Sequence, residues 1–196
     1  MILNCAERLV VNNPLRMAMQ RLEMVWFLQA ADLSPNPRIL EIGCGRGAGA
    51  RILLKKMHPR RIEALDLDPV MMHTAKGFLT SKERERISLL AGDSTRLPFH
   101  SASFDVVFGF GLLHHVPDWE SAVKEVARVL KPGGRYYMEE LYPPLYLNAV
   151  TRRVLLHPTQ NRFHSRDLKA ALSRAGLFLH AFLESGFLGI LGVTVR

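Results

Sequence analysis

The residues with the clearest chemical potential lie in a glycine-rich turn, residues 43–49, in which every second residue is glycine. An aliphatic run, residues 39–42, precedes this turn, and an apolar helical pattern follows it at once. Glycine lets a ligand approach the backbone where a Cβ atom would collide, and the start of the next helix offers free N–H groups. The stretch therefore predicts a strand, a nucleotide-type binding loop and a helix, with close packing of the turn as the alternative reason for the glycines.

A carboxylate follows at the end of the next expected strand, residues 61–67. Asp66 lies roughly twenty residues after Gly43, near the spacing at which such a carboxylate accepts hydrogen bonds from ribose hydroxyls. Asp68 precedes Pro69 and is expected to cap the helix that begins there, so the two aspartates can divide these roles.

The elements that would position these groups alternate between strand and helix patterns. Further strands are expected over residues 87–91, which end before Gly92-Asp93-Ser94, and over residues 104–110, an apolar run typical of a strand buried on both faces. A helix capped by Asp118 and a fifth strand, residues 135–141, follow. This order predicts a doubly wound α/β fold, in which ligands bind beyond the carboxyl ends of the strands.

Two flanking segments complete a single predicted domain, residues 1–196. Residues 1–37 form an N-terminal helical cap, in which a helix over residues 13–31 has an apolar stripe of Leu15, Met19, Leu22 and Trp26; this helix either packs on the sheet or closes over a ligand. Residues 142–164 are irregular and rich in Pro, Tyr, Arg and His, which favours a lid or substrate loop. A helix capped by Ser165 is expected after it, followed by two final strands.

Composition limits the function classes. The net charge of +8 allows an anionic partner such as RNA, a phosphorylated substrate or a membrane surface, but the basic residues are dispersed, as on an ordinary solvated surface. The two cysteines, Cys5 and Cys44, form neither a disulfide framework nor a metal cluster, so no metal site is expected. The N-terminus lacks a signal-peptide core, and we expect a cytoplasmic protein of undetermined oligomeric state.

Several of these segments, taken together and in order, resemble class I S-adenosylmethionine-dependent methyltransferases, in the branch that acts on small molecules, quinone precursors and lipids. The resemblance covers about residues 38–141 and is carried by residues 39–50, Asp66, residues 92–99, 104–107 and 113–115, and Arg128-Val129-Leu130-Lys131-Pro132-Gly133-Gly134. It implies a Rossmann-like sheet of seven strands, the last antiparallel, with helices on both faces.

The resemblance also implies a role for individual residues. Glu41 would orient the methionyl amino group of S-adenosylmethionine, Asp66 would bind the ribose and Asp93 the adenine amino group. The remaining cofactor residues that it implies are Gly43, Gly45, Gly47, Leu67, Ser94, Phe110 and Gly111. Gly109 and Gly111 replace bulkier residues that are common in the family. The glycine turn with Asp66 also fits a loose NAD fingerprint, but Gly92-Asp93 and the Gly133-Gly134 turn have no role in that fingerprint.

Methyl transfer from a sulfonium is an in-line displacement, in which alignment and exclusion of water contribute much of the rate. A base is needed only where the acceptor must lose a proton, and His114 and His115 are the candidates nearest the fourth strand. Glu139, Tyr142 and Tyr146 are candidate substrate-binding residues, with Glu140 beside them. We expect a small organic or lipid-like acceptor, with an RNA-directed methyltransferase or a non-catalytic methyltransferase-like scaffold as the alternatives.

Overall fold

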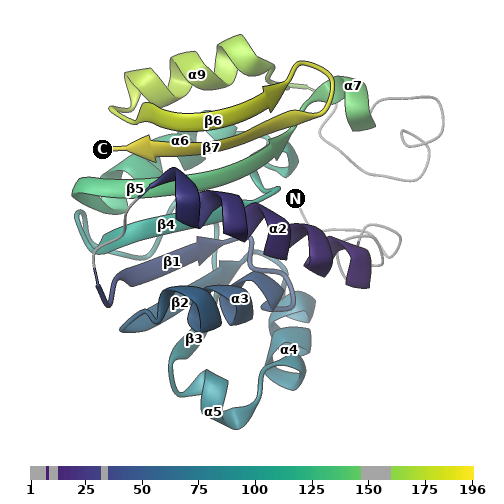
Figure 1. Ribbon diagram of the computed structural model, residues 1–196, viewed down its shortest axis with the longest axis vertical. Coiled ribbons are helices and arrows are strands. Elements are labelled where there is room, and N and C mark those ends of the chain that lie inside the picture. The colour runs from purple at the N-terminus through teal and green to yellow at the C-terminus, as the bar shows by residue number, and fades with distance from the viewer. Residues whose placement is uncertain (1–7, 9–12, 32–34, 147–159) are drawn as a thin grey trace.

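The computed structural model describes residues 8, 13–31, 35–146 and 160–196, which form one seven-stranded sheet with helices on both faces (Figure 1). The strand order is β3-β2-β1-β4-β5-β7-β6, and β7 runs antiparallel to its neighbours β5 and β6 while the other pairs are parallel. The strands are β1 (Arg38–Ile42), β2 (Arg61–Asp66), β3 (Ile87–Ala91), β4 (Phe104–Phe110), β5 (Leu130–Leu141), β6 (Phe178–Ser185) and β7 (Gly189–Val195). The predicted doubly wound fold with an antiparallel last strand is therefore confirmed.

Two hydrophobic clusters lie on opposite faces of the sheet. Residues from α2 (Pro14–Ala30), α3 (Ala48–Met57) and α4 (Pro69–Phe78) pack in one cluster, and residues from α6 (Trp119–Val129) and α9 (Ser165–Arg174) pack in the other. Figure 1 shows α2 and α3 in front of the strands and α6 behind them. The shorter helices are α5 (Ser81–Arg84), η1 (Leu113–His115) and α7 (Pro143–Tyr146). β4 is buried along almost its whole length, as its apolar sequence predicts.

The helix α2 has the predicted bounds but buries a different face. Its N-cap Asn13 accepts a hydrogen bond from the backbone N–H of Leu15 (2.8 Å). The predicted stripe is wrong, because the side chains of Leu15 and Leu22 are 67% and 72% exposed, whereas Met24 and Phe27 pack on the sheet at 0% and 1% exposure. Apolar residues surround most of this helix, so periodicity alone does not select the buried side.

Some boundaries also differ from the sequence-based expectation. The helix α6 ends at Val129 and β5 begins at Leu130, ahead of the predicted start, because the chain extends and pairs with β4 before it passes Gly133. His164, not a serine, is the N-cap of α9. Parts of the predicted lid and cap lie outside the described residues. These parts are residues 147–159 of the lid and residues 1–7, 9–12 and 32–34 of the cap, which include Cys5. None of the helices in the described ranges combines the length and the apolar character that crossing a bilayer requires.

Candidate functional site

The glycine turn is folded around the buried carboxyl group of Glu41, at the end of β1. This group accepts a hydrogen bond from the backbone N–H of Ala50, and a Cβ atom on Gly49 would lie 2.0 Å from Glu41 Oε1. The other oxygen, Oε2, is buried and has no hydrogen-bond partner among the described residues. Burial raises the pKa of Glu41 to about 8, with Ala50 lowering it and nearby Asp66 raising it further. Glu41 thus offers a ligand an acceptor atom that the protein leaves unused.

Asp66 holds the same turn from the end of β2. Its Oδ2 accepts the N–H of Gly45 (2.8 Å), and its Oδ1 accepts the N–H of Asp68 (2.9 Å). Burial raises the pKa of Asp66, and these two N–H groups oppose that rise. Each carboxylate oxygen can accept a second hydrogen bond, so ribose hydroxyls could still bind there.

Asp68 has the separate role that the sequence indicates. Its Oδ1 caps α4 by accepting the N–H of Val70 (2.9 Å), while its Oδ2 accepts from Arg8 (2.6 Å). These bonds leave Asp66 as the ligand candidate at the end of β2.

The third acidic position, Asp93, lies after β3, beside β2 in the sheet. The Asp93 carboxylate accepts from the backbone N–H and the hydroxyl of Thr95, both at 2.8 Å, while Ser94 is buried. Leu67, after β2, keeps 42% of its surface exposed and could cover an apolar ring. Glu41, Asp66 and Asp93 therefore lie at or just after the carboxyl ends of the adjacent parallel strands β1, β2 and β3, as predicted.

The two glycines at the end of β4, Gly109 and Gly111, have a packing explanation. A Cβ atom on Gly109 would lie 3.0 Å from the hydroxyl of Tyr136. Gly111 has a φ of +67° and donates its N–H to the carbonyl of Glu139 (2.8 Å), and a Cβ there would lie 3.3 Å from Glu139 Oε2. The neighbouring Phe110 is buried. Side chains from β5 thus fill the space that bulkier residues would occupy.

Glu140, which is fully buried, organises the segment after β4. Its Oε1 accepts the N–H of Leu113 (2.8 Å) and of Leu112 (3.2 Å), and its Oε2 accepts the N–H of His114 (3.2 Å) and lies 2.9 Å from His114 Nδ1. The His114 ring lies 4.3 Å from the ring of His115 and 5.6 Å from that of Tyr146. Glu140 therefore fixes His114 and is not a free acceptor-binding group.

Glu139, the preceding residue, faces α2 instead. Arg16 of α2 pairs with Glu139 and with Glu23 (2.7 Å to Oε1), and both glutamates are only 8% exposed. Burial raises the pKa of Glu139 to about 8, and Arg16 opposes this effect. Burial likewise raises the pKa of Glu23, again against Arg16. Arg16 and Glu23 were not predicted as site residues, although a spacing of seven residues places both on one face of a helix.

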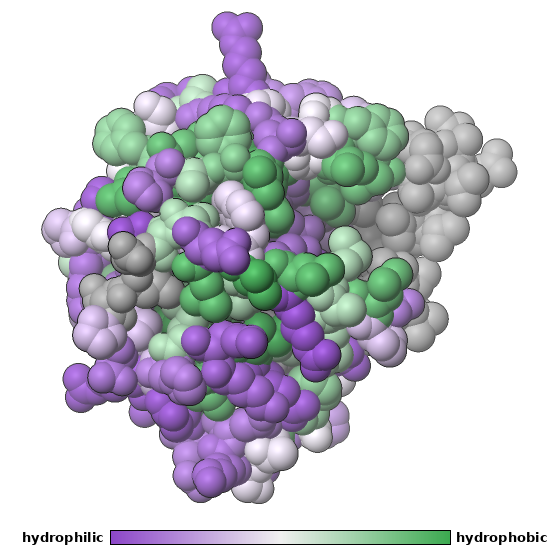
Figure 2. All heavy atoms as spheres, viewed as in Figure 1, coloured by the Kyte–Doolittle hydropathy of each residue, from purple (hydrophilic) through white to green (hydrophobic). Residues whose placement is uncertain are grey.

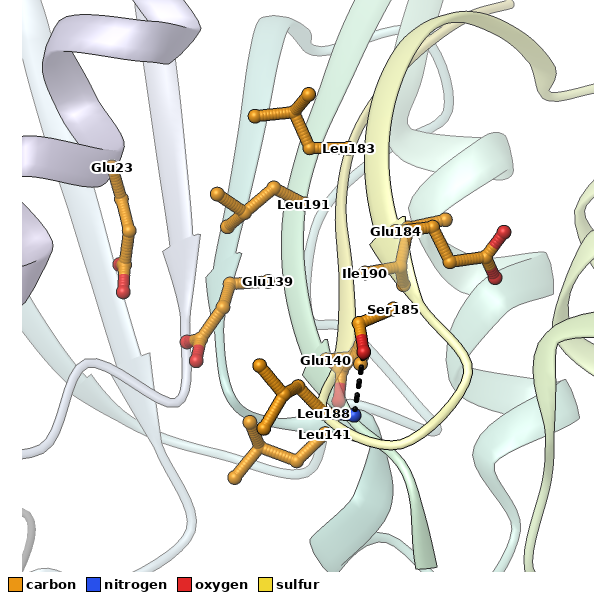
Figure 3. A pocket seen from close by; sticks show the side chains of 11 residues that line it. Glu23, Glu139, Glu140, Leu141, Leu183, Glu184, Ser185, Leu188, Ile190 and Leu191 are labelled. Carbon is orange, nitrogen blue, oxygen red and sulfur yellow. Dashed lines mark hydrogen bonds between the residues drawn. The ribbon is translucent and has the colours of Figure 1, made fainter. Parts of the chain in front are cut away.

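A cavity of about 340 Å³ adjoins this cluster (Figure 3). Its walls come from α2, the end of β5 and the β6–β7 hairpin, namely Glu23, Glu139, Glu140, Leu141, Leu183, Glu184, Ser185, Leu188, Gly189, Ile190 and Leu191. In Figure 3, the Glu184 side chain points away from Glu23 and Glu139. Leu183 and Leu188 are each 53% exposed, so they lie at the mouth of the cavity.

The other two predicted substrate residues, Tyr142 and Tyr146, are buried and do not line this cavity. Tyr142 is 1% exposed and donates its hydroxyl to Glu184 (2.6 Å), and burial raises its pKa. Burial also raises the pKa of Tyr146 to about 12. Among the three predicted residues, Glu139 alone lines the cavity. No cluster of metal-ligating side chains occurs within the described ranges, and we infer no metal site from them.

Comparisons with known proteins agree on one family. Residues 40–138 match a family model described as a methyltransferase domain. The chain is 37% identical over 109 residues to the phthiotriol/phenolphthiotriol dimycocerosates methyltransferase of Mycobacterium leprae, covering 54% of this chain and 38% of that protein. It is 38% identical over 116 residues to the demethylmenaquinone methyltransferase of Lactococcus lactis, covering 57% of this chain and 46% of that protein.

The chain thus spans less than half the length of these two curated relatives. Among solved structures, geranyl diphosphate C-methyltransferase of Streptomyces coelicolor, in complex with Mg²⁺, geranyl diphosphate and S-adenosyl-L-homocysteine, superimposes with a TM-score of 0.75. The two are 15% identical, and the match covers 92% of this chain and 80% of that one. At this identity the match speaks for the fold alone.

Proposed function

The chain belongs to the family of methyltransferase domains, and from this premise we propose that it transfers a methyl group from S-adenosylmethionine to a small, lipid-like acceptor. S-adenosylmethionine is the cofactor of the class to which the chain belongs. When bound, it supplies an electrophilic methyl group on a positively charged sulfur. The protein has to bind this donor, align the acceptor with it and exclude water.

The observation that carries the proposal is the unused, buried Glu41 Oε2 beside a turn in which Gly43, Gly45 and Gly47 all have positive φ. A positively charged amino group of the cofactor fits such an atom, because an ion pair with a donated hydrogen bond would satisfy it. We assign the ribose to Asp66, the adenine to Leu67, Asp93 and Ser94, and the methionyl part to the backbone of Phe110 and Gly111. The cofactor would approach the backbone of the turn at Gly43, Gly45 and Gly47.

The acceptor end of the site lies around the ends of β4 and β5. Glu139 lines the cavity there, Tyr142 bonds to Glu184 in its wall, and Tyr146 packs against His114, so we propose Glu139, Tyr142 and Tyr146 as acceptor-binding. His114 and His115 stay candidate bases, with His114 held by Glu140. The named substrates of the two curated relatives, a phthiotriol dimycocerosate and a demethylmenaquinone, favour an acceptor with a large apolar part.

Isothermal titration calorimetry with S-adenosylmethionine and S-adenosylhomocysteine tests the proposal. We expect binding of both, and transfer of a labelled methyl group to a lipid extract. Absence of cofactor binding at millimolar concentration would contradict the enzymatic role and favour the non-catalytic scaffold. Transfer of the label to RNA and not to lipid would favour the RNA-directed alternative, which no observation on the described residues supports.

A membrane surface is a further proposed contact. Figure 2 shows apolar side chains gathered over α2 on the face that it covers. The exposed ones on this helix are Leu15, Met19, Leu22, Val25 and Leu28. Such a surface, on a chain with a net charge of +8, would favour contact with an anionic bilayer that holds a lipid-like acceptor. We retain the single domain, the lid over residues 142–164 and the cytoplasmic location as predictions from the sequence.

A further inference from the structure

We propose that the cavity beside β5 binds the hydroxyl group of an acceptor with an apolar body, and that Glu139, with Arg16 and Glu23, accepts the hydroxyl proton during O-methylation. The proposal rests on the proposed methyltransferase function and adds to it the chemical class of the acceptor and the group that takes its proton. It concerns residues of α2 and β5 that the cofactor site does not use.

The first argument is an unpartnered acceptor atom. Glu23 is 8% exposed, its Oε1 accepts from Arg16 at 2.7 Å, and its Oε2 is buried without a hydrogen-bond partner among the described residues. Glu23 and Glu139 both line the cavity, and Figure 3 shows them on the side of the drawn residues away from Glu184. A buried carboxylate oxygen left without a donor costs free energy, which an O–H group from a ligand would offset.

The second argument is the position of Glu139 relative to the methyl donor. Its Oε2 lies 3.3 Å from the place that a Cβ atom of Gly111 would occupy. Gly111 belongs to the segment that we assign to the methionyl part of the cofactor. Glu139 therefore lies between the cavity and the donor side of the site, where an acceptor atom must be placed.

The charge of Arg16 distinguishes a hydroxyl from an amine. An oxygen nucleophile gains negative charge as it loses its proton, and a guanidinium beside it stabilises that charge. A neutral amine nucleophile instead attacks without first losing a proton, so it requires neither the carboxylate base nor a guanidinium beside an oxyanion. Because Arg16 pairs with both Glu23 and Glu139, its guanidinium is held where it can act on the reacting oxygen.

The walls of the cavity set the rest of the acceptor. Leu141, Leu183, Leu188, Ile190 and Leu191 provide aliphatic surface, and the mouth is formed by the half-exposed Leu183 and Leu188. An alkyl or prenyl body would lie along these side chains, with its hydroxyl end at Glu139 and Glu23.

The chemical step balances with these groups alone and the donor. The acceptor O–H bond breaks and its proton goes to a carboxylate oxygen of Glu139, while the acceptor oxygen forms a bond to the methyl carbon. The bond from that carbon to sulfur breaks, and its electron pair stays on sulfur. The products are a methyl ether, a neutral thioether and a protonated Glu139, which later loses its proton to solvent.

Binding of matched probes tests the site without relying on turnover. Calorimetry would compare 4-pentylphenol with 4-pentyltoluene, in which a methyl group replaces the hydroxyl, with and without S-adenosylhomocysteine. We expect the phenol to bind at least ten-fold more tightly, and Glu139→Gln and Glu23→Gln each to reduce this preference to less than about three-fold. Equal binding of the two probes to the unmodified protein, or binding of neither, would overturn the proposal.

Glu63→Gln is the matched control, because Glu63 is also 8% exposed and pairs with arginines, Arg61 (3.2 Å) and Arg38 (3.8 Å), on another part of the sheet. It should leave the preference for the phenol unchanged. Circular dichroism would verify that each variant folds, and Glu23→Gln keeps the test open if Glu139→Gln does not fold. A hydroxyl preference that persists in both folded variants would contradict the proposal.

Turnover with labelled cofactor supplies the second readout. We expect label on the oxygen of 4-pentylphenol and not on 4-pentylaniline, and a fall in kcat of at least 100-fold in Glu139→Gln at saturating phenol. Methyl transfer to the aniline alone would overturn the inference while leaving the proposed function standing. A hydroxyl preference without cofactor binding would support the binding site and contradict the proposed function.

Discussion

Glu140 Oε2 lies 2.9 Å from Nδ1 of His114, and the same carboxyl group accepts the backbone N–H groups of Leu112, Leu113 and His114. A single fully buried side chain of β5 thereby fixes the whole segment that follows β4. Because the ends of β4 and β5 are where the acceptor should meet the donor, this carboxylate is a positioning residue for that region and for the orientation of the His114 ring.

Replacing Glu140 by glutamine should destabilise the protein. The amide can accept at its oxygen, but its NH₂ group would face backbone or ring donors and leave at least one of them buried without an acceptor. We expect a loss of about 1–3 kcal/mol in the free energy of unfolding, measured by urea denaturation. Glu120→Gln, in an exposed pair with Arg174, should change it by less than about 0.5 kcal/mol and serves as control. A Glu140→Gln variant as stable as this control would argue against the positioning role.

Asp66→Ala should weaken binding of S-adenosylhomocysteine. The substitution removes the proposed contact to the ribose and also the two hydrogen bonds to Gly45 and Asp68 that hold the glycine turn. We expect a loss of about 1–3 kcal/mol in binding free energy by calorimetry, toward the upper end because the turn is released as well. Asp118→Ala, which removes the cap of α6, should leave the affinity intact. Unchanged affinity in Asp66→Ala would refute the ribose assignment.

The placement of the acidic residues that we assign to the cofactor was predictable, because each lies near the carboxyl end of a strand that the sequence marks clearly. Glu41, Asp66 and Asp93 come after short apolar runs, and parallel strands bring such positions to one edge of the sheet. The hydrogen bonds that Glu41 accepts from Ala50 and Asp66 from Gly45 were not predictable, since these depend on backbone geometry that only the folded loop defines.

The acceptor side was less predictable for two physical reasons. Glu139 and Glu140 are adjacent on β5, and successive side chains of a strand point to opposite faces, so one meets Arg16 of α2 and the other meets His114. The sequence shows that Glu139 and Glu140 are adjacent, but it does not show which face of the sheet each side chain occupies. In α2, apolar side chains occur on several sides, so the pattern concealed that Arg16 and Glu23 lie on the buried one.

The free energy of unfolding should fall as the pH rises toward 8. Burial raises the pKa of Glu41 from 4.5 to about 8, so between these values the folded protein holds a proton that the unfolded chain has already lost. The side chains that face Glu41 include Asp66, which raises its pKa, and the thiol of Cys44. The linkage predicts a loss of up to about 1.4 kcal/mol per pH unit from this one group.

Urea denaturation at a series of pH values from 5 to 8 would measure this slope. Glu41→Gln cannot ionise and should show a flatter profile, although Glu139, whose pKa burial also raises to about 8, contributes a slope of the same sign. The difference between the two profiles isolates Glu41. Parallel profiles for the variant and the unmodified protein would contradict the raised pKa of Glu41.

Gly49→Ala should damage both stability and cofactor binding, because the added methyl group would lie 2.0 Å from Glu41 Oε1 and 3.2 Å from Phe110 Cδ2. Glu41 would have to move from the position in which we propose that its free oxygen meets the cofactor, and Phe110 is already buried. We expect a loss of about 1–3 kcal/mol in the free energy of unfolding from this overpacking, together with at least ten-fold weaker binding of S-adenosylhomocysteine.

Gly77→Ala is the matched control within a helix, since a Cβ atom on Gly77 of α4 would meet no described atom within 4 Å. Alanine is the better helix former, so this variant should gain about 0.5–1 kcal/mol and bind the cofactor as before. Thermal or urea denaturation of the two variants, followed by calorimetry, separates the general effect of replacing a helical glycine from the specific collision at Glu41. If Gly49→Ala behaved like Gly77→Ala in both measurements, the prediction would be wrong. The close contact between Gly49 and Glu41 would then not be required for cofactor binding.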